Sequence, residues 1–193
     1  MIPELGHFAL IVALGIGLVQ FVVPIAGAQK GINSWMAVAR PAAQGLWVFV
    51  AFSFFSLMYA FITKDYSVFA AAEYSNSQLP LIYRIAGVWG GHEGSMLLWI
   101  FMLSTWGLLV SMFSRKLPED MTARVLGVMG FISVGFILFI LLTSNPFERI
   151  IPAPADGRDL NPLLQDPGLA IHPPMLYMGY VGFSVAFAFA IAA

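Results

Sequence analysis

His172 has the most informative neighbours of the three histidines in the chain. It lies in the segment LAIHPPMLYMGYVG, directly before Pro173 and Pro174. Proline suits the first turn of a helix, and the residue before a proline avoids helical geometry, so we expect His172 at or just before an N-cap. The positive end of that helix disfavours the imidazolium, which leaves a ring nitrogen free for a metal, and it attracts carboxylates. The alternative is an interfacial histidine hydrogen-bonded to a loop.

His92 and Trp89 form a second candidate pair, in the segment WGGHEGSMLLW. The glycines around them let the backbone come close to a bound group. Trp89 can stack on a planar ligand or act as an aromatic anchor at a membrane surface. Glu93 or Ser95 can cap the helix that follows. Capping and anchoring explain most of this segment from its residues alone, and His7 lies where a polar residue needs no special role.

The elements that position these residues are five apolar blocks. Of the whole chain, 60% is hydrophobic and only 10% is charged, and the mean hydropathy is +0.85. Each block has about 20 to 24 residues, enough to cross about 30 Å of hydrocarbon as a helix. Backbone groups in lipid need partners within the chain, which favours helices. We therefore predict an all-α, polytopic transmembrane helical bundle that forms a single domain over residues 1–193. The predicted spans are about 5–28, 41–63, 94–113, 124–143 and 173–193.

The loops between these blocks are unequal in length and in charge. The short loops, 29–40 and 114–123, carry Lys30, Arg40, Arg115 and Lys116. The long loops, 64–93 and 144–172, carry Lys64, Arg84, Arg149 and Arg158 over more than twice the length, so their density of basic residues is lower. This bias favours short loops inside and two long loops outside, with the N-terminus also outside. The stretch LPLIYRIAGVW predicts either an interfacial helix or a partly buried loop, and the second long loop predicts turns. The last block lacks a polar flank, so we expect the N-terminal part of a longer protein.

Composition excludes several kinds of chemistry. The chain has no cysteine, so it has no disulfides, thiolate metal sites or cysteine nucleophiles, and its net charge of −1 does not favour binding to nucleic acid. No Walker, His-Glu-x-x-His or Gly-x-Ser-x-Gly motif is present. The helix interiors lack acidic and basic residues, which counts against an ion pump. A transporter or quinone-binding subunit, with Gln20 as its polar mid-span residue, and a non-catalytic assembly scaffold stay open as alternatives.

Three segments resemble one known family. The segments GRDLNPLLQDPGLAIHPPMLYMGYVGFSVAFAFA, SNSQLPLIYRIAGVWGGHEGSMLLW and LFILLTSNPF are similar to cytochrome c maturation protein F, CcmF, and to its relatives in nitrite reductase assembly. The resemblance implies a bacterial inner-membrane component of the system I haem lyase, with its long loops in the periplasm. In that family the chaperone CcmE delivers haem, and CcmH presents apocytochrome c for thioether attachment. The matching motif implies that His172 is one of two periplasmic axial ligands of the haem iron.

Parts of the family pattern have no match in these 193 residues. They are the tryptophan-rich periplasmic segment, the second axial histidine and the two histidines that hold a structural b-type haem. We therefore expect this chain to hold b-type haem in transit on one side only. His92 and Trp89 are weaker candidates for contact with that haem. Alone, the chain is expected to bind haem weakly or not at all and not to catalyse its attachment.

Overall fold

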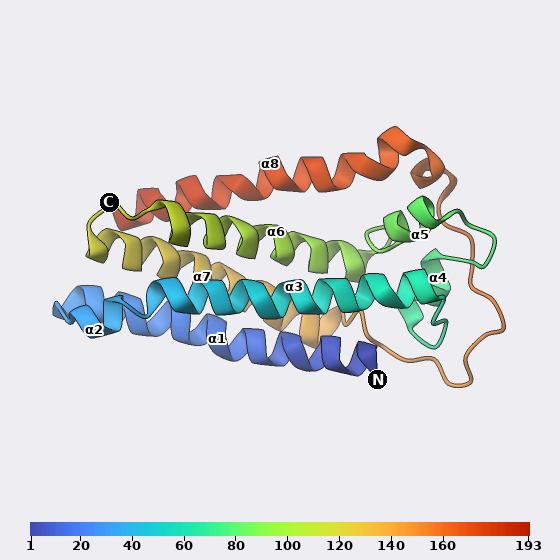
Figure 1. The fold of residues 1–193 in the computed structure, drawn as a ribbon, viewed down its shortest axis with the longest axis horizontal. Helices are drawn as coiled ribbons and strands as arrows, with labels where there is room; N and C mark the ends of the chain where they lie inside the picture. Colours follow the sequence, from blue (N-terminus) through green and yellow to red (C-terminus); the bar gives the residue numbers. More distant parts are fainter.

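The computed structural model describes residues 1–193 as a bundle of helices (Figure 1). Five helical segments are long and apolar enough to cross a membrane, which confirms the predicted all-α transmembrane bundle. Four of the five long helices begin within about five residues of the predicted spans, whose apolar length is a local property. The long helices are α1 (Ile2–Lys30), α3 (Ala39–Thr63), α6 (His92–Phe113), α7 (Glu119–Thr143) and α8 (Pro167–Ala192).

Successive long helices run in opposite directions along the bundle. Figure 1 shows the N-terminus and both long connections at one end, and the C-terminus with the short connections at the other. We call the first of these ends the loop end; it comprises the start of α1, residues 64–91 and residues 144–166. The up-and-down order brings the two predicted outer loops to the same side of the bundle, where they can pack on each other.

Small residues let α1 pack closely against α3 and α7. Ala9, Ala13 and Gly17 are buried along one face of α1, as their four-residue spacing predicts. Farther along that face, the Gln20 Nε2 donates a hydrogen bond of 2.8 Å to the carbonyl of Leu126 on α7. Gln20 therefore joins two helices, which is the packing role expected for a polar residue within a span.

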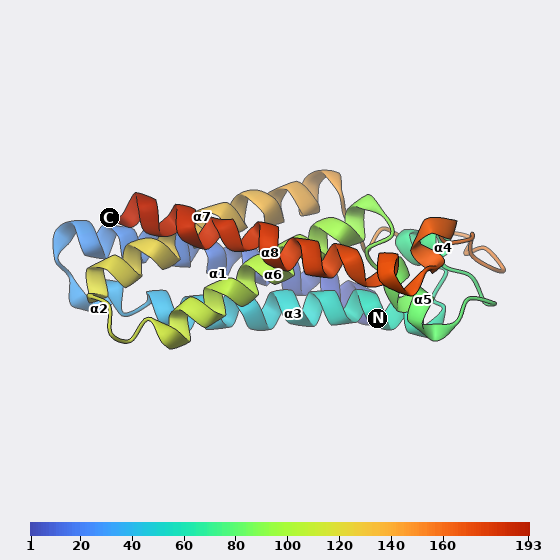
Figure 2. The ribbon, with the colours of Figure 1, turned by 90° about the horizontal axis from the view of Figure 1, so that it is seen from above.

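Helix α8 lies on the outside of the bundle, against α6 and α7 (Figure 2). Only 17% of its most apolar 18-residue window is buried, against 33% to 50% in the other spans. One face of α8 is thus packed and the opposite face is open. The open face carries exposed large apolar side chains at Leu169, Ile171, Met175, Leu176, Tyr180, Phe183, Phe187 and Ile191.

Short helices fill the loop end. The stretch LPLIYRIAGVW forms the helix α5 (Leu81–Gly87), and an additional helix, α4 (Phe69–Tyr74), precedes it. Residues 144–166 are largely irregular, as predicted, apart from the 3₁₀ turn η1 (Pro162–Gln165). At the opposite end, α2 (Asn33–Met36) precedes α3.

The start of α8 differs from the prediction. The helix begins at Pro167, and the side chain of Asp166 caps it by accepting hydrogen bonds from the amides of Gly168 and Leu169 at 2.9 and 3.1 Å. His172 is therefore the sixth residue of α8, and its predicted place at or before the N-cap was wrong. An aspartate followed by proline is a strong helix start, and here it outweighs the preference of a pre-proline residue for extended geometry.

Candidate functional site

His172 stands exposed on α8 near the loop end. Of the three histidines, only His7 makes a side-chain hydrogen bond, so both nitrogens of His172 have no protein partner. Three and four residues farther on, Met175 and Leu176 lie on the same helical face and are 67% and 51% exposed. The imidazole thus stands at the edge of an open apolar surface. His172 lies beyond the first turn of α8, and the effect of the helix dipole falls off within that turn. The dipole is therefore no longer a reason to expect a neutral imidazole.

Trp89 approaches the same part of α8 from the turn between α5 and α6. Its indole Nε1 donates a hydrogen bond of 2.9 Å to the carbonyl of Ala170, two residues before His172. The Trp89 side chain is half-buried. The indole nitrogen of Trp89 is thus engaged with the backbone of α8.

His92 is the first residue of α6 and is exposed. Its ring meets the edge of Phe139 on α7, with 5.9 Å between the ring centroids. It lines one end of an open groove of about 530 Å³ between α6 and α7, whose other lining residues are Met96, Phe131, Ile132, Gly135, Phe136 and Phe139. No polar contact joins His92 to His172.

Two details of the predicted WGGHEGS segment differ in the structure. The N-cap of α6 is Gly91, without a side-chain cap, so the expected capping by Glu93 or Ser95 was wrong. The Ser95 hydroxyl instead donates to the carbonyl of His92 at 2.9 Å. A methyl group added at Gly91 would lie 2.0 Å from the Tyr74 ring. The absence of a side chain at Gly91 therefore makes room for the Tyr74 ring of the same chain.

His7 has a structural setting at the loop end. Its Nδ1 lies 3.2 Å from Oδ1 of Asn145, which also accepts the amide of Phe147 at 3.1 Å. Since this amide oxygen can only accept, Nδ1 of His7 carries the proton in that pair. The contact fastens the start of α1 to the segment after α7.

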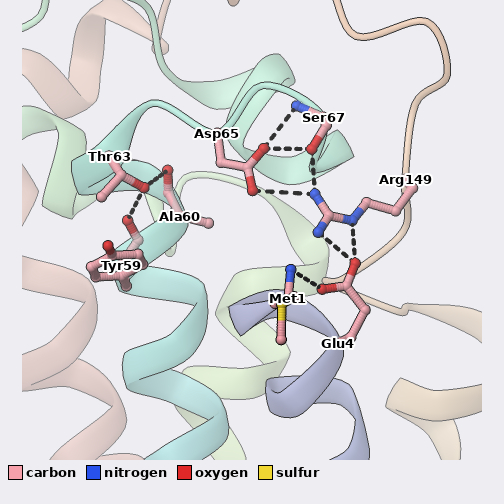
Figure 3. A network of polar contacts seen from close by, with 8 residues as sticks. All are labelled: Met1, Glu4, Tyr59, Ala60, Thr63, Asp65, Ser67 and Arg149. Atoms are coloured by element: carbon pink, nitrogen blue, oxygen red, sulfur yellow. Dashed lines mark hydrogen bonds and ion pairs between the residues drawn. The ribbon is translucent and has the colours of Figure 1, made fainter.

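Arg149 makes a larger polar network that the sequence did not indicate (Figure 3). Its Nε and Nη2 donate to one oxygen of Glu4 at 2.9 and 2.5 Å. Its Nη1 lies 3.2 Å from Oδ2 of Asp65 and also donates to the hydroxyl of Ser67, which in turn donates to Asp65. The guanidinium thus joins the start of α1, the segment after α3 and the segment after α7.

Backbone bonds extend this junction between the two long connections. The amide of Phe69 donates to the carbonyl of Glu148 at 2.8 Å, and the amide of Ile150 donates to the carbonyl of Ser67 at 2.9 Å. Burial raises the pKa of the Asp65 carboxyl, but the hydrogen bond from Ser67 and the contact with Arg149 outweigh it, so that the net pKa lies below the usual 3.8. The Asp65 carboxylate therefore stays charged at neutral pH.

A second set of contacts fastens residues 156–159 to residues 72–77. Asp156 accepts the amide and the hydroxyl of Ser77 at 2.9 and 2.6 Å, and Arg158 pairs with Glu73 at 2.8 Å. The segment that leads into α8 is thus held by the other long connection at several points. The predicted turn-rich loop is irregular in secondary structure and well tied in space.

Comparisons with known proteins are consistent along the chain. Residues 89–193 match the family model described as "Cytochrome C assembly protein". The whole chain is 62% identical to the cytochrome c-type biogenesis protein CcmF of Pseudomonas aeruginosa and 60% identical to that of Pseudomonas fluorescens, and it covers 30% and 29% of those proteins. A solved structure titled "Cytochrome c Heme Lyase CcmF" shares the fold, with a TM-score of 0.84 over the whole chain, 30% of that structure's chain and 24% identity. The chain thus spans less than a third of the length of these relatives.

Proposed function

Because this chain belongs to the family of cytochrome c assembly proteins, we propose that it forms part of a haem lyase in cytochrome c-type biogenesis and that His172 is an axial ligand of the incoming haem. The observation that carries the proposal is the exposed imidazole of His172, without a protein partner, beside an open apolar face at the loop end of α8. His172 also lies within the residues that match the family model.

The chemistry around His172 suits one side of a haem. A neutral imidazole nitrogen is a common axial ligand of haem iron, and the exposed Met175 and Leu176 offer apolar surface to a porphyrin. His7 is engaged with Asn145, so its Nδ1 is already used. The second axial ligand would come from a part of the protein outside this chain. His172 would then hold the iron from one side and fix the distance of the porphyrin from α8.

The chain would position its substrate while the bond-forming groups come from elsewhere. The reaction adds the cysteine thiols of apocytochrome c to the vinyl groups of haem. In this proposal CcmE delivers b-type haem in transit and CcmH presents the apocytochrome. The single transmembrane domain of residues 1–193 would hold the loop end rigid through Arg149 and Asp156, and α8 would present His172 from it.

The proposed location is the inner membrane of a bacterium, with the loop end in the periplasm. The higher density of Lys and Arg in the short connections supports this orientation. The grouping of both long connections at one end of the bundle is compatible with it (Figure 1). His172 would then face the compartment in which cytochrome c receives its haem.

The variant His172→Ala tests this proposal in the full protein, expressed with its haem chaperone. Because His172 is exposed, the variant should insert normally. The haem in transit that copurifies with the wild type should be lost, whereas a structural b-type haem held by other histidines should stay. His92→Ala removes the other exposed imidazole of the loop end and should leave most of the haem in place. Unchanged haem in His172→Ala would refute the proposal, and loss with His92→Ala alone would transfer the ligand role to His92.

The alternatives make different predictions in the same experiment. A non-catalytic scaffold would give crosslinks from residues 144–172 to partners without any haem spectrum. A transporter or quinone-binding subunit would show transport or quinone-dependent signals that His172→Ala does not change. A low-spin, bis-histidine signal of the haem in transit that disappears in His172→Ala, while the signal of the structural haem stays, distinguishes our proposal from both.

A further inference from the structure

Helix α8 contains two prolines at positions where a helix normally needs hydrogen-bond donors. Pro173 and Pro174 are the seventh and eighth residues of the helix, beyond the first turn in which a missing N–H costs nothing. The carbonyls four residues earlier, those of Leu169 and Ala170, therefore lose their usual donors. Figure 1 shows α8 changing direction close to this end, as expected where prolines interrupt the hydrogen-bond ladder.

The two residues that carry these carbonyls differ in exposure. Leu169 is 44% exposed, whereas Ala170 is only 2% exposed. A buried carbonyl without a donor is costly, so the carbonyl of Ala170 needs a partner from elsewhere in the fold. The indole Nε1 of Trp89 supplies it at 2.9 Å, from a residue 81 positions away in the chain. This bond replaces the one that Pro174 cannot make.

Trp89 is itself held in place by the packing at the loop end. Its backbone amide donates to the carbonyl of Ala86 at 3.2 Å, and Val88 beside it is buried. On the other side, a methyl group added at Gly90 would lie 2.8 Å from Leu160. The indole therefore projects from a fixed turn onto the segment of α8 in which the two prolines interrupt the backbone hydrogen bonds.

We propose that Trp89 is a positioning residue for His172, acting through the carbonyl of Ala170. The proline-interrupted segment can pivot about Pro173 and Pro174, and the indole hydrogen bond sets its direction. Two residues after this anchor, the direction of the segment decides where the His172 imidazole points. Axial ligation requires the nitrogen lone pair to face the iron, so a change in this direction weakens haem binding. The inference rests on the proposed role of His172 as a haem ligand.

A second tryptophan, Trp106 on α6, provides a matched control on the same helix α8. The Nε1 of Trp106 donates to the carbonyl of Met178 at 3.0 Å, a bond of the same kind farther along α8. Four residues after Met178 stands Gly182, which has a backbone N–H, so this carbonyl keeps its usual donor. Loss of the Trp106 bond should therefore leave the direction of α8 unchanged.

The test compares Trp89→Phe with Trp106→Phe in the full protein, using haem titration and electron paramagnetic resonance of the bound haem. Replacement by phenylalanine keeps an aromatic ring and removes only the donor. We expect Trp89→Phe to weaken haem binding by about tenfold, the lower end of the effect of removing groups that orient metal ligands, and to shift the low-spin signal. Trp106→Phe should stay within about twofold of the wild type, a change of well under 1.4 kcal/mol.

A rescue experiment separates positioning from a general loss of structure. Pro174→Ala returns a backbone N–H to the carbonyl of Ala170, so the indole is no longer its sole donor. In the Pro174→Ala background, adding Trp89→Phe should cost less than about twofold, and the two substitutions should be non-additive. Hydrogen exchange of residues 168–178 in haem-free protein should increase in Trp89→Phe and not in Trp106→Phe.

Each result has a definite meaning. The positioning role is overturned if His172→Ala loses haem while Trp89→Phe binds and exchanges like the wild type, or if the two tryptophan variants behave alike. Full additivity in the Pro174→Ala background would also overturn it. If His172→Ala keeps its haem, the proposed function fails, and the positioning role toward haem fails with it.

Discussion

Replacing Arg149 by methionine should loosen the junction of the two long connections without unfolding the bundle. The substitution keeps an unbranched apolar stem and removes the guanidinium, and with it the contacts with Glu4, Asp65 and Ser67. The Glu4 side chain is 57% exposed, so water screens that pair, which should contribute less than about 1 kcal/mol. The Asp65 side chain is 35% exposed, and after allowance for screening by water its charge-assisted contacts should contribute about 1 kcal/mol to the stability of the junction.

The expected total is therefore about 1–2 kcal/mol, which raises the population of the locally opened junction by a factor of about 5 to 30. Hydrogen exchange in lipid nanodiscs measures this population directly. The amides of Phe69 and Ile150, which bond across the junction to Glu148 and Ser67, should exchange faster by that factor. Amides in the middle of α3 and α7 should exchange as in the wild type, because their bonds lie within the bundle.

Two further variants control for this result. Arg158→Met removes a guanidinium from the same connection, but Arg158 is 76% exposed and pairs only with Glu73, so the amides of Phe69 and Ile150 should change by less than about twofold. Arg149→Lys keeps the positive charge but loses the planar set of guanidinium donors. The exchange rates of the two amides in this variant should therefore lie between those of the wild type and of Arg149→Met. Wild-type exchange at Phe69 and Ile150 in Arg149→Met would refute the reasoning, as would an equal effect of Arg158→Met.

Two more perturbations probe the same end of the bundle. The lowered pKa of Asp65 means that its contribution to stability is fully present above the unfolded value of about 3.8 and is lost as the pH falls through the lower folded value. Proteolysis of residues 144–160 should therefore increase as the pH falls through the acid range, and the increase should be smaller in Asp65→Asn, which keeps only the contributions of Glu4 and Asp156, whose pKa values are also lowered by their hydrogen bonds; an identical step in both proteins would contradict a contribution from Asp65. Gly157→Ala would place a methyl group 1.9 Å from the carbonyl oxygen of Ser75, so the loop should be destabilised by about 1–3 kcal/mol and cleaved faster. Gly15→Ala, which meets no atom within 4 Å, should be cleaved like the wild type, and equal cleavage of the two alanine variants would count against the close approach.

The irregular path of residues 144–166 gains its order from other segments. The bonds of Arg149 and Asp156 reach residues 65–67 and 77, which belong to the other long connection. Polar, turn-forming residues in the sequence predicted irregular structure correctly, but they did not indicate the partners. Because α8 follows directly after this segment, the loop contacts also hold the first turn of the helix that carries His172 at the loop end.

Local properties of the chain determined the helices themselves. The length of each apolar block sets whether it can span a membrane, and this length is read along the chain without knowledge of neighbours. The same holds for the four-residue spacing of Ala9, Ala13 and Gly17 on α1. For α5, the apolar spacing left a helix and a partly buried loop open, and the structure has the helix. The start of α8 was also encoded locally, in Asp166 and Pro167, although the His172-Pro173 pair gave the competing and wrong expectation.

Contacts between distant residues were decided only by the tertiary structure. Trp89 and Ala170 are 81 residues apart, and Arg149 and Glu4 are 145 apart, so no spacing in the sequence relates them. Their partners depend on which helix ends meet, and that depends on the packing of five similar apolar helices around one another. The sequence thus singled out His172 by its neighbours, whereas the fold decided which donor orients the helix beneath it, because a hydrogen bond depends on proximity in space and not on order along the chain.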